Sequence, residues 1–339
     1  MEKEQYQGPI ISLDKVNVSF LKRGFTLGQE KHYHVLKDIS LDIYPGEILA
    51  IVGESGCGKT TLGKVITGLL KPDSGKILFQ GEEVYKFFST GSGEYRKAVQ
   101  FIQQDSYAAL NPVRTIYQLL YAPIRANDKS LTLEQIEKEM IANLVTVGLT
   151  PAEQFLFKYP HQLSGGQRQR ILMARAISLK PKVIVADEPV SMIDVSLRLS
   201  ILNLMSRLNK ELNIAFIYIT HDLATARYIA RNGKIAVMYL GEIMEYSSLQ
   251  ELLTNPKHPY TRALLSAVPV PDPEIARKMK KIPIKTMDLM NLEHRKDGCS
   301  FAPRCLFATE ECLKGNIPYR EENQAEVRCL KKIKEENQG

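Results

Sequence analysis

Eight residues in the first fifth of the chain have the types and spacing of a phosphate site. We call GESGCGKT, residues 53–60, the phosphate-binding loop. In this pattern glycines let backbone N–H groups surround phosphate oxygens, the lysine reaches the outer phosphates, and the threonine hydroxyl is offered to Mg²⁺. A helix starting there would present its positive end to the same anion. The predicted nucleotide contacts are Gly53, Glu54, Ser55, Gly56, Cys57, Gly58, Lys59, Thr60 and Thr61.

A second chemical feature is an acidic pair after an apolar run. VIVADE, residues 183–188, predicts a buried strand that ends in two carboxylates, at the edge where ligands of open α/β sheets gather. On a chain that already carries a phosphate-binding loop, we expect Asp187 to hold Mg²⁺. We expect Glu188 to orient and deprotonate an attacking water. The alternative, a solvated acidic strand end, is the commoner meaning of such a pair when it occurs alone.

LSGGQ, residues 163–167, predicts another anion-binding helix terminus. Ser164 has the side chain of an N-cap, two glycines follow it, and a helix is expected over residues 167–179. One nucleotide has little use for two helix termini on the same chain, so the pattern favours two subunits that face each other. The candidates for this role are Ser164, Gly165, Gly166 and Gln167.

Strands and helices alternate around these motifs. Apolar patterning predicts helices over 62–70, over much of 104–178 and over 195–212, and polar residues predict a loop over 21–34. Alternation of buried strands with helices predicts an α/β fold with a parallel sheet covered on both faces. The expected strands are 10–20, 35–47, 47–53, 182–187, 214–220, 234–240 and 242–247.

Over residues 10–255 the chain resembles the ATP-binding-cassette (ABC) family, whose signature is LSGGQ. The resemblance implies a P-loop NTPase with a RecA-like core, an antiparallel β subdomain and a helical subdomain over about 104–178. It implies that Gln104 contacts Mg²⁺ and the membrane partner. It also implies that SMID at 191–194 is the D-loop and that His221 contacts the γ-phosphate. Two cassettes would then sandwich two ATP molecules.

The resemblance also requires an aromatic side chain to stack on adenine. Phe20 stands where that residue is expected, at the end of a predicted strand. Phe25 and Tyr33 are alternatives because the predicted loop around them is long. A core position is an equally good interpretation of Phe20.

NPKHPYTRALLSAVPVP, residues 255–271, resembles a segment that follows the cassette in ATP-binding subunits of dipeptide and oligopeptide permeases. This implies a cassette domain over 1–255 and an extension over 256–339. It also implies an importer at the cytoplasmic face of the inner membrane. The implied partners are a second, related ABC ATPase subunit, two transmembrane permease subunits and an extracytoplasmic peptide-binding protein. Nickel or glutathione stays open as the cargo.

Four of the five cysteines lie in the extension, at Cys299, Cys305, Cys312 and Cys329. Disulfides are disfavoured in the cytoplasm. The gaps are longer than the usual zinc spacing, whereas iron–sulfur clusters accept varied gaps between four thiolates. The permease resemblance also points to a 4Fe–4S cluster at these positions. Zinc and free thiols remain the alternatives, and Cys57 is expected to be a small filler in the phosphate-binding loop.

Composition excludes several classes of protein. The 339 residues are 44% hydrophobic and 24% charged, as in ordinary globular proteins, and no apolar run is long enough to span a membrane. The N-terminus lacks the apolar core of a signal peptide. The net charge of +7 is dispersed, so nucleic acid is not an expected partner. The rivals are a soluble ABC ATPase acting on nucleic acid or ribosomes, and a regulatory module that binds ATP without turnover.

Overall fold

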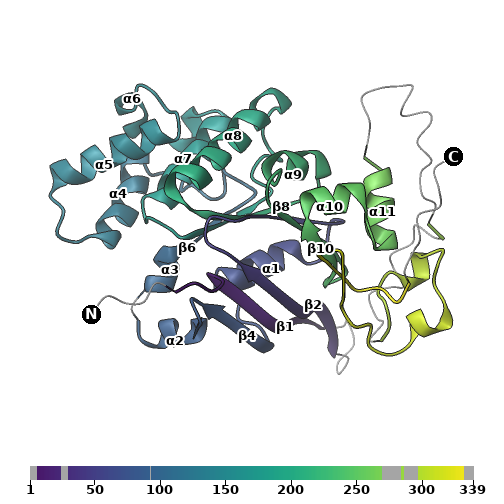
Figure 1. Cartoon of the computed structure of the whole chain (residues 1–339). Coiled ribbons are helices and arrows are strands. Elements are labelled where there is room, and N and C mark those ends of the chain that lie inside the picture. The colour runs from purple at the N-terminus through teal and green to yellow at the C-terminus, as the bar shows by residue number, and fades with distance from the viewer. Residues whose placement is uncertain (1–5, 24–29, 92, 269–283, 286–296, 332–339) are drawn as a thin grey trace.

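The chain forms two β-sheets with helices packed around them (Figure 1). The computed structural model describes residues 6–23, 30–91, 93–268, 284–285 and 297–331. The strands are β1 (Ile11–Arg23), β2 (Glu30–Ile43), β3 (Ile48–Val52), β4 (Ser74–Phe79), β5 (Glu82–Glu83), β6 (Val99–Ile102), β7 (Val183–Asp187), β8 (Ala215–Thr220), β9 (Lys234–Tyr239), β10 (Glu242–Ser248), β11 (Arg320–Glu322) and β12 (Ala325–Val327). Within these residues the strand orders are β11-β12-β10-β9-β3-β8-β7-β6 in the larger sheet and β2-β1-β4-β5 in the smaller.

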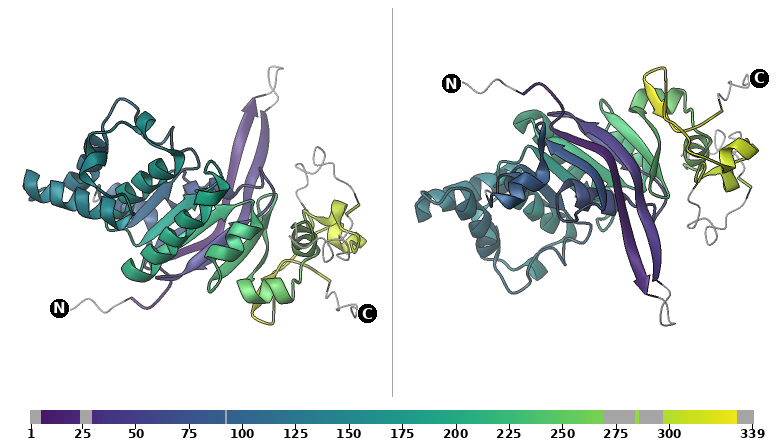
Figure 2. Two further views of the ribbon diagram at one scale, coloured as in Figure 1. Left: turned by 90° about the horizontal axis from the view of Figure 1, so that it is seen from above. Right: turned by 90° about the horizontal axis from the view of Figure 1, so that it is seen from below.

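Helices cover both faces of the larger sheet. They are α1 (Lys59–Ile66), α2 (Val84–Ser89), α3 (Glu94–Ala98), α4 (Ile116–Asn127), α5 (Leu133–Thr146), α6 (Glu153–Leu156), α7 (Gly165–Ile177), α8 (Val195–Leu212), α9 (Leu223–Ile229), α10 (Leu249–Thr254) and α11 (Pro259–Ser266). Helix α1 packs between the two sheets, against β7, β8 and β2. Helices α4, α5 and α6 lie at one side of the molecule and the C-terminal extension lies at the other (Figures 1 and 2).

The predicted parallel sheet is confirmed for β6, β7, β8, β3 and β9. Successive residues of these strands belong to two cores. Ala50 and Val52 face the helices α4–α9, whereas Leu49 and Ile51 face α1 and the smaller sheet. Burial on both faces explains the nearly continuous apolar runs in the sequence. The carboxyl ends of these strands share one edge of the sheet, where the chemical motifs follow them.

Two boundaries differ from the prediction. The expected loop over 21–34 is wrong, because β1 continues to Arg23 and β2 begins at Glu30. They form a long hairpin that projects from the molecule (Figure 2). Backbone pairing needs no apolar side chains, so an exposed ribbon leaves no hydrophobic pattern. The helix expected to reach residue 70 ends at Ile66, and Leu69 is 63% exposed. The prediction for 195–212 is confirmed by α8.

The extension after α10 is joined to the cassette. Strand β12 pairs antiparallel with β10, so the extension continues the larger sheet. Phe301 and Cys305 belong to the same buried core as the helices of the cassette. On β10, the buried carboxylate of Glu245 accepts hydrogen bonds from the backbone N–H groups of Lys257 and His258, at 2.9 and 2.8 Å. In the described residues, no helix combines the length and apolar character needed to cross a bilayer.

Candidate functional site

The phosphate-binding loop connects β3 to α1. Gly58 has a φ of 104°, and a Cβ there would lie 2.7 Å from the carbonyl oxygen of Val35, so only glycine fits. Lys59 is 6% exposed, and its Nζ donates to the carbonyl oxygens of Gly53 and Glu54, at 2.8 Å each. No side chain caps the first turn of α1. Backbone N–H groups at this helix end therefore remain for an anion.

Strand β7 brings an acidic side chain to the same edge. Asp187, its last residue, is 3% exposed, and its Oδ1 atom has no hydrogen-bond partner. Burial raises the pKa of Asp187, although the nearby Thr60 hydroxyl acts in the opposite direction. A buried carboxylate oxygen without a partner, beside a hydroxyl, is an oxygen donor set of the kind that Mg²⁺ prefers. These residues therefore fit the predicted cation.

Glu188 is held by two side chains from neighbouring strand ends. His221 Nδ1 lies 2.7 Å from Glu188 Oε1, and Gln104 Nε2 donates to Glu188 Oε2 at 3.0 Å. Gln104 follows β6 and His221 follows β8, so three residues distant in sequence meet because their strands are neighbours. They line a hollow of about 400 Å³ together with Val35, Ser55, Gly56, Gly58, Lys59, Thr60 and Thr61.

The LSGGQ motif lies elsewhere on the chain. Ser164 is the N-cap of α7: its Oγ accepts from the N–H of Gln167 at 3.2 Å, and Gln167 Oε1 accepts from the N–H of Ser164 at 3.0 Å. This reciprocal capping box starts the helix at Gly165, two residues earlier than predicted. Residues 164–167 do not line the hollow at the phosphate-binding loop.

The aromatic candidates for adenine stacking differ in position. Phe20 and Tyr33 are cross-strand partners in the hairpin, and Phe20 is 46% exposed. Tyr33 lines a smaller hollow of about 90 Å³ beside the phosphate-binding loop, with Gly56 and Cys57 in its wall. Phe20 does not line that hollow, and Phe25 lies outside the described residues. Of these two residues it is Tyr33, one of the two predicted alternatives to Phe20, that lines the hollow beside the loop.

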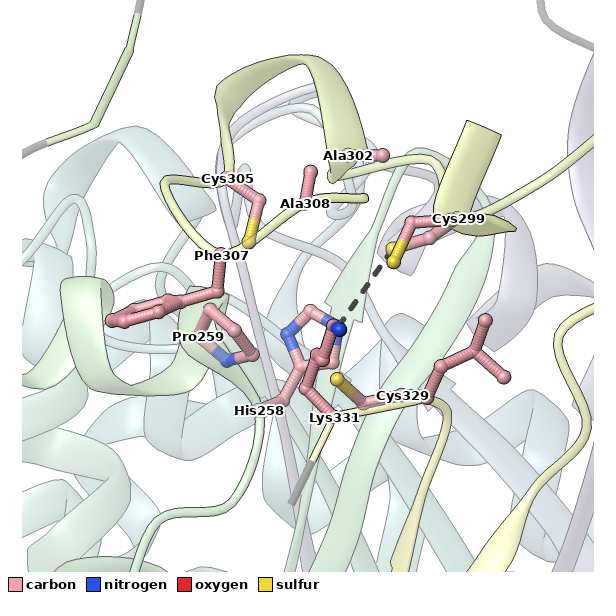
Figure 3. Close-up of a pocket in the computed structure, with 11 residues that line it drawn as sticks. His258, Pro259, Cys299, Ala302, Cys305, Phe307, Ala308, Cys329 and Lys331 are labelled. Atoms are coloured by element: carbon pink, nitrogen blue, oxygen red, sulfur yellow. Dashed lines mark hydrogen bonds between the residues drawn. The ribbon is translucent and has the colours of Figure 1, made fainter. Parts of the chain in front are cut away.

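The four cysteines of the extension line one small cavity of about 20 Å³ with His258 (Figure 3). None of the four forms a disulfide, and Cys305, Cys312 and Cys329 are buried. Burial raises the pKa of Cys299 to about 12, and neighbouring thiols add to this effect. Among the described residues, no three His, Cys, Asp or Glu side chains are placed to hold one metal ion. The thiols thus share a cavity without converging on a single-ion site.

His258 is the N-cap of α11. Its Nδ1 accepts a hydrogen bond from the N–H of Tyr260 at 3.0 Å, and burial lowers its pKa to about 3. The ring is therefore neutral with its proton on Nε2, which lies 3.9 Å from Cys299 Sγ. The sequence did not predict the contact with Cys299, because the two residues lie 41 positions apart.

Three features meet at one edge of the sheet: the phosphate-binding loop, the buried carboxylate of Asp187, and Glu188 with its hydrogen-bonded partners. Together they define an ATP-hydrolysing P-loop protein. The helical subdomain that carries LSGGQ places it in the ATP-binding-cassette class. The ABC transporter family model matches residues 36–191, and the model of the oligopeptide/dipeptide transporter C-terminal region matches residues 244–312. The chain belongs to the ATP-binding proteins of oligopeptide and dipeptide ABC transporters.

Individual relatives support this membership. The chain is 42% identical over 297 residues to the oligopeptide transport ATP-binding protein OppF of Haemophilus influenzae, covering 87% of this chain and 88% of that protein. It is 40% identical to the dipeptide transport ATP-binding protein DppF of the same organism, covering 89% and 90%. A solved dimer of the cassette MJ0796 in a post-hydrolysis state, bound to ADP and Pi, has a TM-score of 0.62 and 28% identity. It covers 70% of this chain and 98% of its own.

Proposed function

We propose that the chain is the ATP-hydrolysing subunit of an importer that takes up oligopeptides or dipeptides. One observation carries the hydrolytic part: Lys59, Glu188 and His221 all line the same hollow. The similarity of residues 244–312 to the C-terminal region of oligopeptide and dipeptide transporters supports the cargo class. A complete catalytic set disfavours a module that only binds ATP.

The residues in and beside the hollow have separate roles in the hydrolysis of ATP. Backbone N–H groups of the phosphate-binding loop and Lys59 bind the phosphates. Thr60, Asp187 and Gln104 would hold Mg²⁺, which would supply neutralisation of phosphate charge. Glu188 accepts a proton from water while the water oxygen forms a bond to the γ-phosphorus. The bond from that phosphorus to the bridging oxygen breaks, which releases ADP and phosphate. His221 orients the Glu188 carboxylate through Nδ1.

A second, related cassette subunit completes each site in this proposal. Ser164, Gly165, Gly166 and Gln167 lie outside the chain's own phosphate hollow, at a capped helix terminus suited to an anion. They would contact the γ-phosphate held by the other subunit. The dimeric state of the similar cassette MJ0796 supports this arrangement. ATP then favours the closed pair, because its contacts to both subunits exist only in that state.

The remaining partners are two transmembrane permease subunits and an extracytoplasmic peptide-binding protein, with this chain on the cytoplasmic face of the inner membrane. A hollow of about 640 Å³ beside α4 supports docking of a permease subunit. It is lined in part by Val113 and Leu133, which are 79% and 65% exposed. Exposed apolar side chains grouped around one hollow are typical of interaction sites.

The test of this function is ATP hydrolysis in the assembled transporter, reconstituted with its permease subunits and binding protein. We expect peptide-loaded binding protein to raise the ATPase rate severalfold over the unloaded protein, because cargo would favour closure of the cassettes. Nickel and glutathione serve as competing cargoes. Stimulation by either of these, with no response to peptides, would contradict the peptide assignment and leave the ATPase assignment intact.

We further propose that Cys299, Cys305, Cys312 and Cys329 hold a 4Fe–4S cluster. Two observations support this proposal: all four cysteines line one cavity, and four cysteine thiolates are the ligand set of such a cluster. The His258 Nε2–H group would donate to the Cys299 sulfur, and such hydrogen bonds adjust a cluster's properties. The cluster would cross-link segments of the extension whose described strands, β11 and β12, are only three residues long.

Removing one cysteine should remove the cluster. In protein purified without oxygen, Cys305→Ser is expected to lose most iron, acid-labile sulfide and visible absorption, because one iron loses its thiolate. Cys57→Ser is the matched control, since Cys57 lies in the phosphate-binding loop and should keep the iron content unchanged. Colourless, iron-free wild-type protein, or zinc in stoichiometric amount, would contradict the proposal.

A further inference from the structure

The segment between the first two cysteines of the extension contacts the phosphate-binding loop. Arg304 is 4% exposed and immediately precedes Cys305. Its Nη1 atom donates to both carboxylate oxygens of Glu54, at 3.0 and 2.9 Å, and to the Tyr239 hydroxyl at 3.1 Å. The Glu54 side chain is 32% exposed, so the ion pair is shielded from solvent mainly on the arginine side.

A second residue of the extension binds the backbone of the same loop residue. The N–H group of Glu54 donates to the hydroxyl of Tyr260 at 3.0 Å. The Tyr260 ring packs on Tyr239 and Phe301, with centroid distances of 4.6 and 5.3 Å. Arg304 also lies near the rings of Tyr239 and Phe301. The extension therefore holds both the main chain and the side chain of Glu54.

The contacts of Arg304 and Tyr260 with Glu54 affect nucleotide binding, because Glu54 carries a negative charge. A carboxylate in a loop that surrounds phosphates repels the anion it must bind, unless a cation compensates it. Arg304 supplies that cation and restrains the carboxylate. The backbone position of Glu54 matters too, because its carbonyl oxygen is one of the two that accept from Lys59 Nζ. Displacement of Glu54 would therefore also disturb the lysine that reaches the phosphates.

We propose that Arg304 and Tyr260 are positioning residues for the phosphate-binding loop, so that the C-terminal extension completes the nucleotide site. They act through Glu54, by cancelling its charge and fixing its backbone, without touching the nucleotide. This inference rests on nucleotide binding at the loop. It requires neither peptide cargo nor a metal cluster.

The affinity of the full-length chain for a fluorescent ATP analogue measures this role. Arg304→Ala should weaken binding about tenfold, because it leaves an uncompensated carboxylate beside the phosphates. In the assembled transporter, the KM for ATP should rise by the same factor while kcat at saturating ATP is retained, since the lost interaction acts equally on ground and transition states. Tyr260→Phe, which removes the acceptor for the Glu54 N–H group, should weaken binding by about threefold.

Two further results separate charge compensation from loss of packing. The double variant with Arg304→Ala and Glu54→Gln should bind ATP nearly as tightly as Glu54→Gln alone, because the carboxylate that repels the phosphates is gone. About 0.5 M KCl should shrink the ratio between wild-type and Arg304→Ala affinities through screening. If Arg304→Ala does not fold, Arg304→Lys serves instead: it keeps the positive charge, so its loss of affinity should be smaller and should depend less on salt.

Arg328 supplies the matched control. Its side chain, like that of Arg304, is almost fully buried, and it forms an ion pair at 3.1 Å with Glu242 on β10. Arg328→Ala should lower Tm as Arg304→Ala does, yet retain ATP affinity. Either of two results would overturn the proposal: folded Arg304→Ala that binds ATP with wild-type affinity, or a double variant that binds ATP as weakly as Arg304→Ala alone. Wild-type protein that binds no ATP would refute the nucleotide site itself.

Discussion

Glu188→Gln is expected to lower the ATPase rate of the assembled transporter by about 1,000-fold, the contribution typical of a general base. Glutamine keeps the size of the side chain and can still hydrogen-bond to Gln104 or His221, which lie 3.0 and 2.7 Å from the carboxylate. It cannot accept a proton from water. ATP binding should persist, because the contacts of the phosphate-binding loop are untouched.

The Glu188→Gln variant should therefore accumulate as an ATP-bound, closed pair of cassettes. Size-exclusion chromatography or crosslinking with ATP and Mg²⁺ measures this species, and ADP should not support it. Glu47→Gln is the control. Glu47 lies just before β3, whereas the phosphate-binding loop follows the other end of this strand, and its carboxylate pairs with Lys234 at 3.2 Å. Turnover near the wild-type rate in Glu188→Gln would remove this residue from its role.

Ser164→Asp should reduce turnover by about 100-fold, a loss of the size seen when transition-state charge stabilisation fails. Aspartate caps a helix as well as serine does and suits the positive end of α7, so the fold should be preserved. Its negative charge would repel a γ-phosphate that the opposite subunit presents. ATP binding to the chain's own phosphate-binding loop should stay normal, because residues 164–167 do not line that hollow.

Ser164→Asn separates charge from shape in this experiment. Asparagine is nearly isosteric with aspartate and also caps helices, but it carries no charge, so its loss of turnover should be far smaller. The full chain in the assembled transporter is compared for ATPase rate, and the isolated chain for ATP affinity. If Ser164→Asp weakened ATP binding by the isolated chain, the LSGGQ segment would belong to the same chain's site, and the two-chain scheme would fail.

The local sequence pattern was sufficient to predict helices with a strong apolar periodicity and strands that are buried on both faces of the sheet. Helix α8 has the predicted bounds, and β3, β7 and β8 lie within a residue of theirs, because residues buried on both faces must all be apolar. Prediction from the pattern failed for segments whose secondary structure does not depend on buried apolar side chains. Polar residues formed the outer part of the β1–β2 hairpin through backbone pairing, and Leu69 matched a helical period without being buried.

The site divides in the same way. Lys59, Asp187 and Glu188 were predicted from motifs, because the chemistry of phosphate and Mg²⁺ restricts which residue types can serve at those spacings. His221 was predicted from the family resemblance. Motifs did not show that Gln104 and His221 both bond to Glu188. That contact depends on strand order, which brings β6, β7 and β8 together.

Local patterns predicted the chemistry of the phosphate-binding loop, the acidic pair and the LSGGQ helix terminus, because their residue types restrict what they can bind. The spacing of the four thiols did not, since it left a cluster, zinc and free thiols open. The tertiary structure alone decided which distant residues meet. The Glu54 carboxylate joins Arg304, 250 positions later, and Tyr33 rather than Phe20 lines the hollow beside the loop. Such contacts depend on packing between segments, and no local pattern of residues records which segments will pack together.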